Sequence, residues 1–222
     1  DIGQITALKG ISEESGAIQI GSFTVHRDVQ QSELIQTNLP LLSYAAAQIG
    51  GGMQVHNRGT IGGNIVSMHP LYDILPSLLA LGADVDILKD GEEQRMALAD
   101  LMKDASHGLG SESLLVRVLL KPMTPDAGWA YEKLKITAGG YGSANAAAIV
   151  TLDSDKITSL RIIVGAVSAL PVDISDALSD YRGQAWSEHL AEEIEAKASA
   201  AIKEPLSDHQ GDGDWRRAMA GV

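Results

Sequence analysis

The chain has 222 residues, of which 45% are hydrophobic and 21% charged, a composition typical of one large or two small globular domains. Its formal net charge of −12 repels nucleic acid and anionic membranes, and no apolar run reaches the roughly 20 residues that cross a bilayer, so neither partner is expected. There is no cysteine, which excludes disulfides and cysteine-ligated zinc or iron–sulfur sites in this chain and fits a cytoplasmic protein.

The first part of the chain mixes short strands with helices. Periodicity and breaker residues predict strands at 17–21, 84–88 and 114–120 and helices at 40–49, 73–81 and 97–102. Pro40 and Pro76 stand in first helical turns, where a missing N–H does no harm. Asp90-Gly91 is a hairpin signal after the second strand. Glycines 50–52 end the first helix, and residues 107–110 are expected to form a loop.

After a linker at 123–128 the pattern changes to consecutive strands, predicted at 129–135, 144–152 and 157–167. A tight turn at 153–156 joins the last two, so an antiparallel meander is expected. A helix at 187–203 follows, with apolar residues spaced by four on one face: Leu190, Ile194, Ala198 and Ile202. Residues 208–214 are expected to be irregular.

These elements predict an α+β fold in two domains. Residues 1–124 form an α/β part that carries a glycine-rich segment, and residues 125–222 form a three-stranded antiparallel sheet covered by helix.

The glycine-rich segment at 58–64 is the strongest functional signal. Gly59, Gly62 and Gly63 stand beside Thr60 and Asn64, which suits a loop whose backbone N–H groups turn toward a phosphate. The spacing matches neither the dinucleotide fingerprint nor a P-loop, because no G-x-G-x-x-G and no following lysine are present. A plain turn is the alternative interpretation.

Other candidate residues have ordinary alternatives. Asp73 can bind a ribose hydroxyl or cap a helix, and His56 and His69 can contact a ligand or be plain polar loop residues. In Gly139-Gly140-Tyr141-Gly142, Tyr141 can stack on a planar ring or belong to a simple hairpin. Lys133 can approach a phosphate or a reduced flavin, or be an exposed strand lysine.

No catalytic residue or metal site is predicted. The histidines lack the i, i+4 spacing of a helical zinc motif, and no serine stands in a G-x-S-x-G elbow.

Several segments together resemble the FAD-binding subunit or domain of molybdenum hydroxylases, which include the medium subunit of carbon monoxide dehydrogenase and the flavin domain of xanthine dehydrogenase. The resemblance rests first on 54–64, which contains Thr-Ile-Gly-Gly-Asn, then on Pro70, Asp73 and 78–83. Further similarity lies at 18–22, 131–133, 165–167 with 171–172, and 214–217. The resemblance covers nearly the whole chain.

The resemblance implies an FAD-binding subdomain of the vanillyl-alcohol-oxidase/p-cresol-methylhydroxylase type, followed by the family's C-terminal antiparallel-sheet domain. It implies that the backbone of Thr60, Ile61, Gly62, Gly63 and Asn64 holds the FAD pyrophosphate. It also implies cofactor contacts for a second group of side chains, namely Asn64, Ser67, Asp73, Leu115, Lys133 and Tyr141. Leu115 is expected near the adenine or the flavin, and Lys133 near the flavin end.

The implied function is that of an oxidoreductase subunit, which passes electrons from iron–sulfur clusters through FAD to an acceptor. The expected partners are a molybdopterin-binding large subunit and an iron–sulfur small subunit, which would carry those other cofactors. Alone, the chain is expected to be inactive.

Two departures from the family pattern suggest an alternative. The family has a further N-terminal subdomain with a second glycine loop, and this chain is expected to begin at the end of that subdomain and to stop within the last helix. The family's arginine and aspartate after the strand at 129–135 are replaced in 136–140. The alternative is a scaffold or assembly module that kept the fold and lost FAD.

Overall fold

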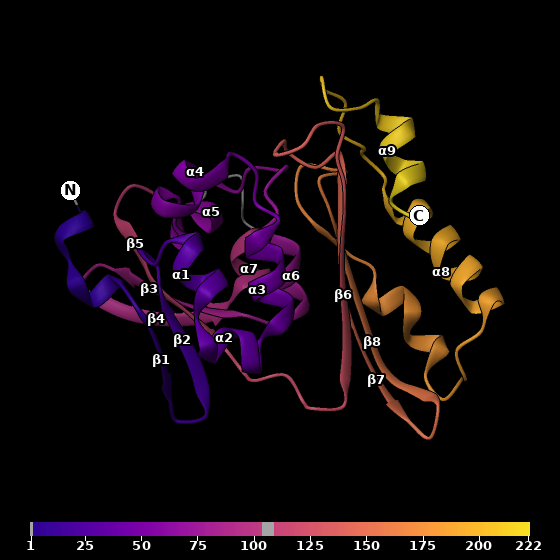
Figure 1. Cartoon of the computed structure of the whole chain (residues 1–222), viewed down its shortest axis with the longest axis horizontal. Helices are drawn as coiled ribbons and strands as arrows, with labels where there is room; N and C mark the ends of the chain where they lie inside the picture. The colour runs from indigo at the N-terminus through magenta and orange to yellow at the C-terminus, as the bar shows by residue number, and fades with distance from the viewer. Residues whose placement is uncertain (1, 104–108) are drawn as a thin grey trace. The chain divides into compact units, whose positions relative to one another are not determined.

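The computed structural model describes residues 2–103 and 109–222, which fold into two compact units (Figure 1). The N-terminal unit contains residues 1–68 and 81–123, and the C-terminal unit contains 69–80 and 124–222. The segment 69–80 therefore packs with residues that follow it by more than 40 positions. The domain division at residue 125 stays a prediction of the sequence.

The N-terminal unit is built on a five-stranded antiparallel sheet with the order β1-β2-β5-β3-β4. Its strands are β1 (Ile11–Glu14), β2 (Ala17–Gly21), β3 (Asp84–Lys89), β4 (Glu92–Ala97) and β5 (Ser113–Leu120). The predicted strands at 17–21, 84–88 and 114–120 and the hairpin at Asp90-Gly91 are confirmed. The predicted loop at 107–110 lies partly outside the described residues.

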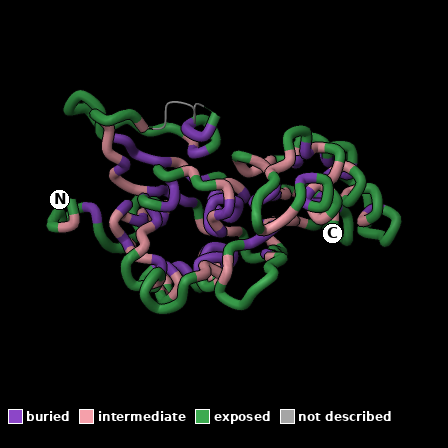
Figure 2. The backbone as a smooth tube through the Cα atoms, turned by 90° about the horizontal axis from the view of Figure 1, so that it is seen from above, coloured by how far each residue is buried: buried purple, intermediate pink, exposed green. Residues whose placement is uncertain are grey.

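Buried and partly exposed residues alternate in β2 of this sheet, whereas β3 and β5 contain runs of consecutive buried residues. Ile18, Val85 and Val118 are fully buried, whereas Asp86 and Arg117 carry an ion pair between neighbouring strands at 3.3 Å. Figure 2 shows the buried segments of the chain in purple among exposed segments in green. The apolar residues of the sheet thus supply the core of this unit.

Short helices complete the unit, with the bounds α1 (His26–Gln31), α2 (Glu33–Asn38), α3 (Pro40–Ala47), α4 (Gly52–Arg58), α5 (Ile61–Ser67) and α7 (Leu98–Lys103). The predicted helices at 40–49 and 97–102 correspond to α3 and α7. Two 3-10 turns, η1 (Ile2–Gln4) and η2 (Thr6–Leu8), precede the sheet. The glycine segment does not form a loop, because Ile61 to Ser67 is helical.

The C-terminal unit contains the predicted meander of β6 (Ala127–Leu134), β7 (Ala144–Asp153) and β8 (Lys156–Gly165), with every pair antiparallel. A short fourth strand, β9 (Val172–Asp173), pairs with β8. The predicted helix at 73–81 is α6 (Ile74–Ala80), which contacts β7 and β8. Gly165 of β8 allows this approach, since a Cβ there would stand 2.5 Å from Pro76 Cγ.

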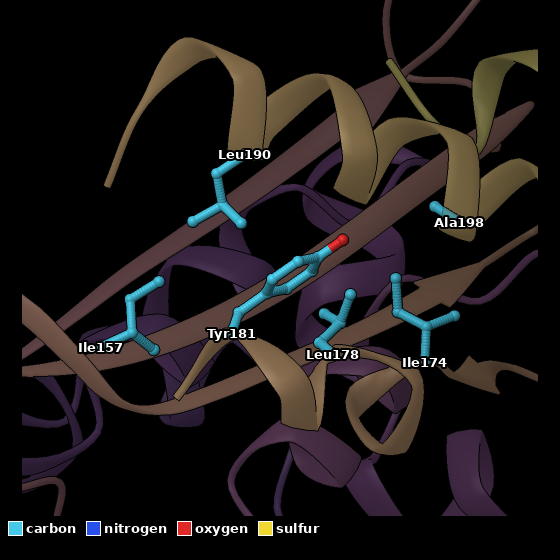
Figure 3. Packing of buried hydrophobic residues seen from close by; sticks show 6 residues of the cluster. All are labelled: Ile157, Ile174, Leu178, Tyr181, Leu190 and Ala198. Carbon is cyan, nitrogen blue, oxygen red and sulfur yellow. The ribbon is translucent and has the colours of Figure 1, made fainter. Parts of the chain in front are cut away.

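Helices pack against the same meander through a separate apolar cluster. It joins β8 to η3 (Ser175–Tyr181) and α8 (Glu188–Ala201) and contains Ile157, Ile174, Leu178, Tyr181, Leu190 and Ala198 (Figure 3). The Ser187 side chain accepts a hydrogen bond from Leu190 N–H and starts α8, which confirms the predicted helix and its apolar face.

Residues 208–212 form no helix or strand element, as expected, and the short helix α9 (Gly213–Met219) begins at the end of this tail. Asp212 caps α9 by accepting a hydrogen bond from Asp214 N–H. Within the described ranges, no helix is both long and apolar enough to cross a membrane.

Replacing Gly165 tests the packing of α6. We expect Gly165→Ala to reduce the free energy of unfolding by about 1–3 kcal/mol, because the new Cβ would overlap Asn145 Oδ1 at 2.3 Å and Pro76 at 2.5 Å. Gly128→Ala is the control, since the shortest contact of its Cβ would be with the side-chain methyl Val150 Cγ1 at 3.2 Å. Equal losses for the two variants in urea unfolding would contradict this role for Gly165.

Candidate functional site

The glycine segment forms the first turn of α5, and its N–H groups already have acceptors in the protein. Ile61 N–H donates to Thr24 O at 3.0 Å, and Gly62 N–H donates to Ser22 O at 2.8 Å. Gly63 N–H donates to Thr60 Oγ1 at 3.0 Å, so Thr60 is the N-cap of the helix. In this structure the three N–H groups are therefore already hydrogen-bonded within the protein, and the role of this backbone in holding a phosphate stays a prediction.

Close contact explains one of the glycines. A Cβ on Gly62 would lie 2.6 Å from Ser22 O and 2.7 Å from Ser22 Cβ, so only glycine lets α5 rest on this strand end. A Cβ on Gly63 would meet Thr60 Oγ1 at 3.0 Å. The segment is therefore held by its own backbone bonds and by a close approach to Ser22.

Polar side chains at this turn retain hydrogen-bonding capacity. Asn64 Oδ1 and Ser22 Oγ are buried without a hydrogen-bond partner in the described part of the chain. Thr60 uses its oxygen as an acceptor, which leaves its hydroxyl hydrogen to donate. Ser67, by contrast, donates to Gly63 O at 2.7 Å within its own helix. Buried polar atoms without partners cost free energy and are uncommon, so Ser22 and Asn64 stand out here, and the contact of Asn64 with a cofactor stays a prediction.

His26 lies behind Asn64 and received no role from the sequence. It is 1% exposed, and its Nε2 lies 3.4 Å from Asn64 Nδ2. Burial, together with the nearby His56, lowers the pKa of His26 from 6.5 to about 4. The imidazole is therefore neutral at neutral pH and accepts or donates as a neutral ring. In the sequence His26 stands out only by its position a few residues after the end of the predicted strand at 17–21.

A second polar cluster lies in the C-terminal unit, around Asp73 and Lys133. Lys133 Nζ pairs with Asp73 Oδ2 at 2.8 Å, and the two side chains are 3% and 2% exposed. Tyr131 Oη donates to Asp73 O at 2.9 Å, and burial raises its pKa well above the ordinary value. Burial also raises the pKa of Asp73, although Lys133 acts to lower it. The pair ties the start of α6 to β6.

Tyr141 lies close to this pair. It is 44% exposed, and a Cβ on the next residue, Gly142, would lie 3.3 Å from the Lys133 side chain. Leu115 is different, because it is 2% exposed on β5 and belongs to the core of the N-terminal unit. The structure thus groups Thr60 to Ser67 on α5 and groups Asp73, Lys133 and Tyr141 in the other unit. Their contacts with a cofactor stay predictions.

A pocket of about 460 Å³ opens on the meander in the C-terminal unit. Small side chains on β7, Ala146 and Ala148, contribute to one wall, and Ile194 and Ala198 of α8 contribute to another. Its lining is largely apolar and, of the predicted cofactor residues, includes Lys133 alone. We therefore assign no cofactor to this pocket.

Breaking the Asp73–Lys133 pair tests whether it holds the C-terminal unit together. Lys133→Met and Asp73→Asn should each lower the free energy of unfolding by about 3–5 kcal/mol, because each leaves a buried group without its partner. The double variant should lose less than the sum. Lys103→Met is the control, since its pair with Asp100 is exposed at 78% and 62%. Additive losses in urea unfolding would contradict the coupling.

The low pKa of His26 predicts a pH-dependent stability. Unfolding restores the pKa from about 4 to 6.5, so the unfolded chain binds more protons between these values. The contribution of His26 to the free energy of unfolding is fully present above pH 6.5. It falls by up to about 3 kcal/mol as the pH drops to about 4. His26→Gln should flatten the curve measured by urea unfolding, whereas His189→Gln at an 80% exposed position should not. Parallel curves for wild type and His26→Gln would exclude this assignment.

Comparison with known proteins matches both parts of the chain. The family model described as FAD binding domain in molybdopterin dehydrogenase matches residues 1–122. The model described as CO dehydrogenase flavoprotein C-terminal domain matches residues 129–222.

Individual relatives agree with these matches. The carbon monoxide dehydrogenase medium chain of Hydrogenophaga pseudoflava is 34% identical over all of this chain and 77% of its own length. The glyceraldehyde dehydrogenase medium chain of Sulfolobus acidocaldarius is 27% identical over all of this chain and 78% of its own length. A solved structure of carbon monoxide dehydrogenase from Hydrogenophaga pseudoflava superposes with a TM-score of 0.93 at 31% identity, covering this whole chain and 77% of its counterpart. The chain belongs to the family of FAD-binding medium subunits of molybdenum-hydroxylase-type dehydrogenases.

Proposed function

We propose that this chain is the flavoprotein component of a molybdenum-hydroxylase-type oxidoreductase, and that it binds FAD and passes electrons from iron–sulfur clusters to an acceptor. The match of the FAD-binding model to residues 1–122 carries the proposal. When bound, FAD would supply the electron-transfer chemistry, and the chain would bind and orient it. No general base is needed for that role.

Side chains at α5 are the proposed contacts to the FAD pyrophosphate. The Thr60 hydroxyl can donate to a phosphate oxygen while its lone pair still caps Gly63 N–H. The Asn64 amide has one end without a partner within the described residues. This proposal moves the contact from backbone N–H groups to side chains, because Ile61, Gly62 and Gly63 already donate within the protein.

The other predicted cofactor contacts stay proposals, and most of these side chains already contact other residues of the chain. Ser67, Asp73 and Lys133 are engaged in bonds within the chain, and Leu115 is a core residue. Tyr141 is 44% exposed and is proposed to flank the planar flavin ring.

The proposed partners are a molybdopterin-binding large subunit and an iron–sulfur small subunit. The relatives are described as medium chains, which implies assemblies with other chains. This sequence has no cysteine, so cysteine-ligated clusters would lie outside these 222 residues. The cytoplasmic location and the inactivity of the isolated chain stay predictions.

A second candidate is a scaffold or assembly module that does not bind FAD. The internal bonding of the three N–H groups at 61–63 favours it, because those donors are not available to a phosphate. The two candidates differ in one measurable property, the affinity for FAD.

Titration calorimetry with FAD tests the proposal. We expect the purified protein to bind FAD and to show flavin absorbance. Thr60→Val should weaken binding about 10-fold or more, since a hydrogen bond to a charged phosphate is worth about 1.5–3 kcal/mol. Thr158→Val is the matched control, because that hydroxyl donates to Thr151 O at 2.9 Å on the exposed β7–β8 hairpin. No binding by the wild type would leave the scaffold candidate standing, and unchanged binding by Thr60→Val would remove Thr60 from the site.

A further inference from the structure

Three aromatic rings of the C-terminal unit pack together beside the Asp73–Lys133 pair. His69 and Tyr141 are stacked, with ring centroids 5.5 Å apart and planes at 25°. Tyr72 lies 5.0 Å from His69 and 6.3 Å from Tyr141, tilted to both. These separations are in the range where aromatic pairs attract each other by about 0.5–1.5 kcal/mol beyond area burial. We call this group the aromatic trio.

His69 is held in place by the backbone of its own turn. Leu71 N–H donates to His69 Nδ1 at 3.2 Å, and Tyr72 N–H donates to His69 O at 3.1 Å. A nitrogen that accepts a hydrogen bond carries no proton, so neutral His69 has its proton on Nε2. The ring plane of His69 is thereby fixed relative to the start of α6.

The loop that carries Tyr141 has a second support. Gly139 adopts a φ of +74, which permits the sharp turn after β6. Gly142 packs on the aliphatic part of the Lys133 side chain. A Cβ added to Gly142 would lie 3.3 Å from both Cε and Cγ of Lys133. Lys133 is itself fixed by Asp73. The backbone of the loop is thus placed by Lys133, and the Tyr141 ring is placed by His69.

Tyr141 keeps surface for another planar group. It is 44% exposed although it stacks on His69, and no hydrogen bond of its hydroxyl is formed with the residues the structure describes. Burial against its neighbours raises the pKa of Tyr141, with Tyr72 and Asp73 adding to the effect, so the phenol stays neutral.

We propose that His69 is a positioning residue that holds the Tyr141 ring by stacking, so that Tyr141 presents its ring to the flavin of FAD. This inference rests on the proposed function. It assigns His69 a role that acts through Tyr141 rather than through a direct ligand contact. The proposal also predicts that a planar ring at position 69 is what holds Tyr141 in place. The hydrogen bond from Leu71 N–H to His69 Nδ1 is less important for the position of Tyr141.

Flavin fluorescence in the FAD-loaded protein tests the proposal, because a phenol held against a flavin quenches its emission by electron transfer and a phenylalanine ring does not. Tyr141→Phe should therefore increase the emission per bound FAD. His69→Ala should increase it to a similar level, since the phenol loses its stacking partner. His69→Phe should keep the wild-type emission. His189→Ala, at an 80% exposed site on α8, is the control and should change nothing.

A second measurement follows the stacking without the cofactor. The ring protons of Tyr141 should show ring-current shifts in NMR spectra of the FAD-free protein, and these shifts should be lost in His69→Ala and kept in His69→Phe. Thermal unfolding would show that each variant is folded.

The outcomes separate the inference from the proposed function. Wild-type emission in His69→Ala, with increased emission in Tyr141→Phe, would overturn the role of His69. Unchanged emission in both variants, with FAD bound, would overturn the placement of Tyr141 while leaving FAD binding intact. A wild-type protein that binds no FAD would overturn the proposed function itself, and the inference with it.

Discussion

The buried pair of Asp73 and Lys133 is the interaction on which the C-terminal unit depends. Two opposite charges that are 2% and 3% exposed must satisfy each other, because neither has water to replace its partner. Their contact joins residues 60 positions apart and fixes the start of α6 against β6. Tyr131 adds a donor to the same residue, and Gly142 rests on the Lys133 stem. The aromatic trio lies beside this ion pair.

The N-terminal unit uses a different principle for its candidate site. Its glycine helix is docked by backbone hydrogen bonds onto Ser22 and Thr24, and Gly62 permits the close approach. This arrangement satisfies the N–H groups that a phosphate would otherwise bind. Side chains with spare capacity, such as Asn64, then become the polar groups that can recognise a ligand.

Much of the fold could be predicted from the sequence where the pattern is local. The alternation at 84–88 with Asp90-Gly91 and the apolar face at 187–203 both gave correct elements, because period and turn chemistry act over a few residues. The short helices α1 and α2 were not predicted, since six residues contain too little periodicity. The glycine segment was predicted as a loop because glycines let the backbone approach an anion. In the structure the Thr60 cap and the docking on Ser22 hold 61–67 as a helix, although glycine has a low helix propensity.

The candidate site was only partly predictable, because local sequence patterns do not show contacts between distant segments. Thr60 and Asn64 could be named from their motif, but the burial of His26 depends on packing from distant segments. Asp73 and Lys133 were each predicted to contact a cofactor. Their mutual pairing could not be read from the sequence, since no local pattern links positions 73 and 133.

The interleaving of the two units has a consequence for synthesis. Helix α6 leaves the ribosome before the strands that it packs on, because β7 (Ala144–Asp153) and β8 (Lys156–Gly165) follow α6 (Ile74–Ala80) much later in the chain. Until then its apolar residues, such as Leu75 and Leu78, have no sheet to pack on, although both end fully or nearly fully buried. The nascent chain therefore exposes the apolar side chains of this segment for part of its synthesis. Chaperone binding at this stage would protect the segment from aggregation.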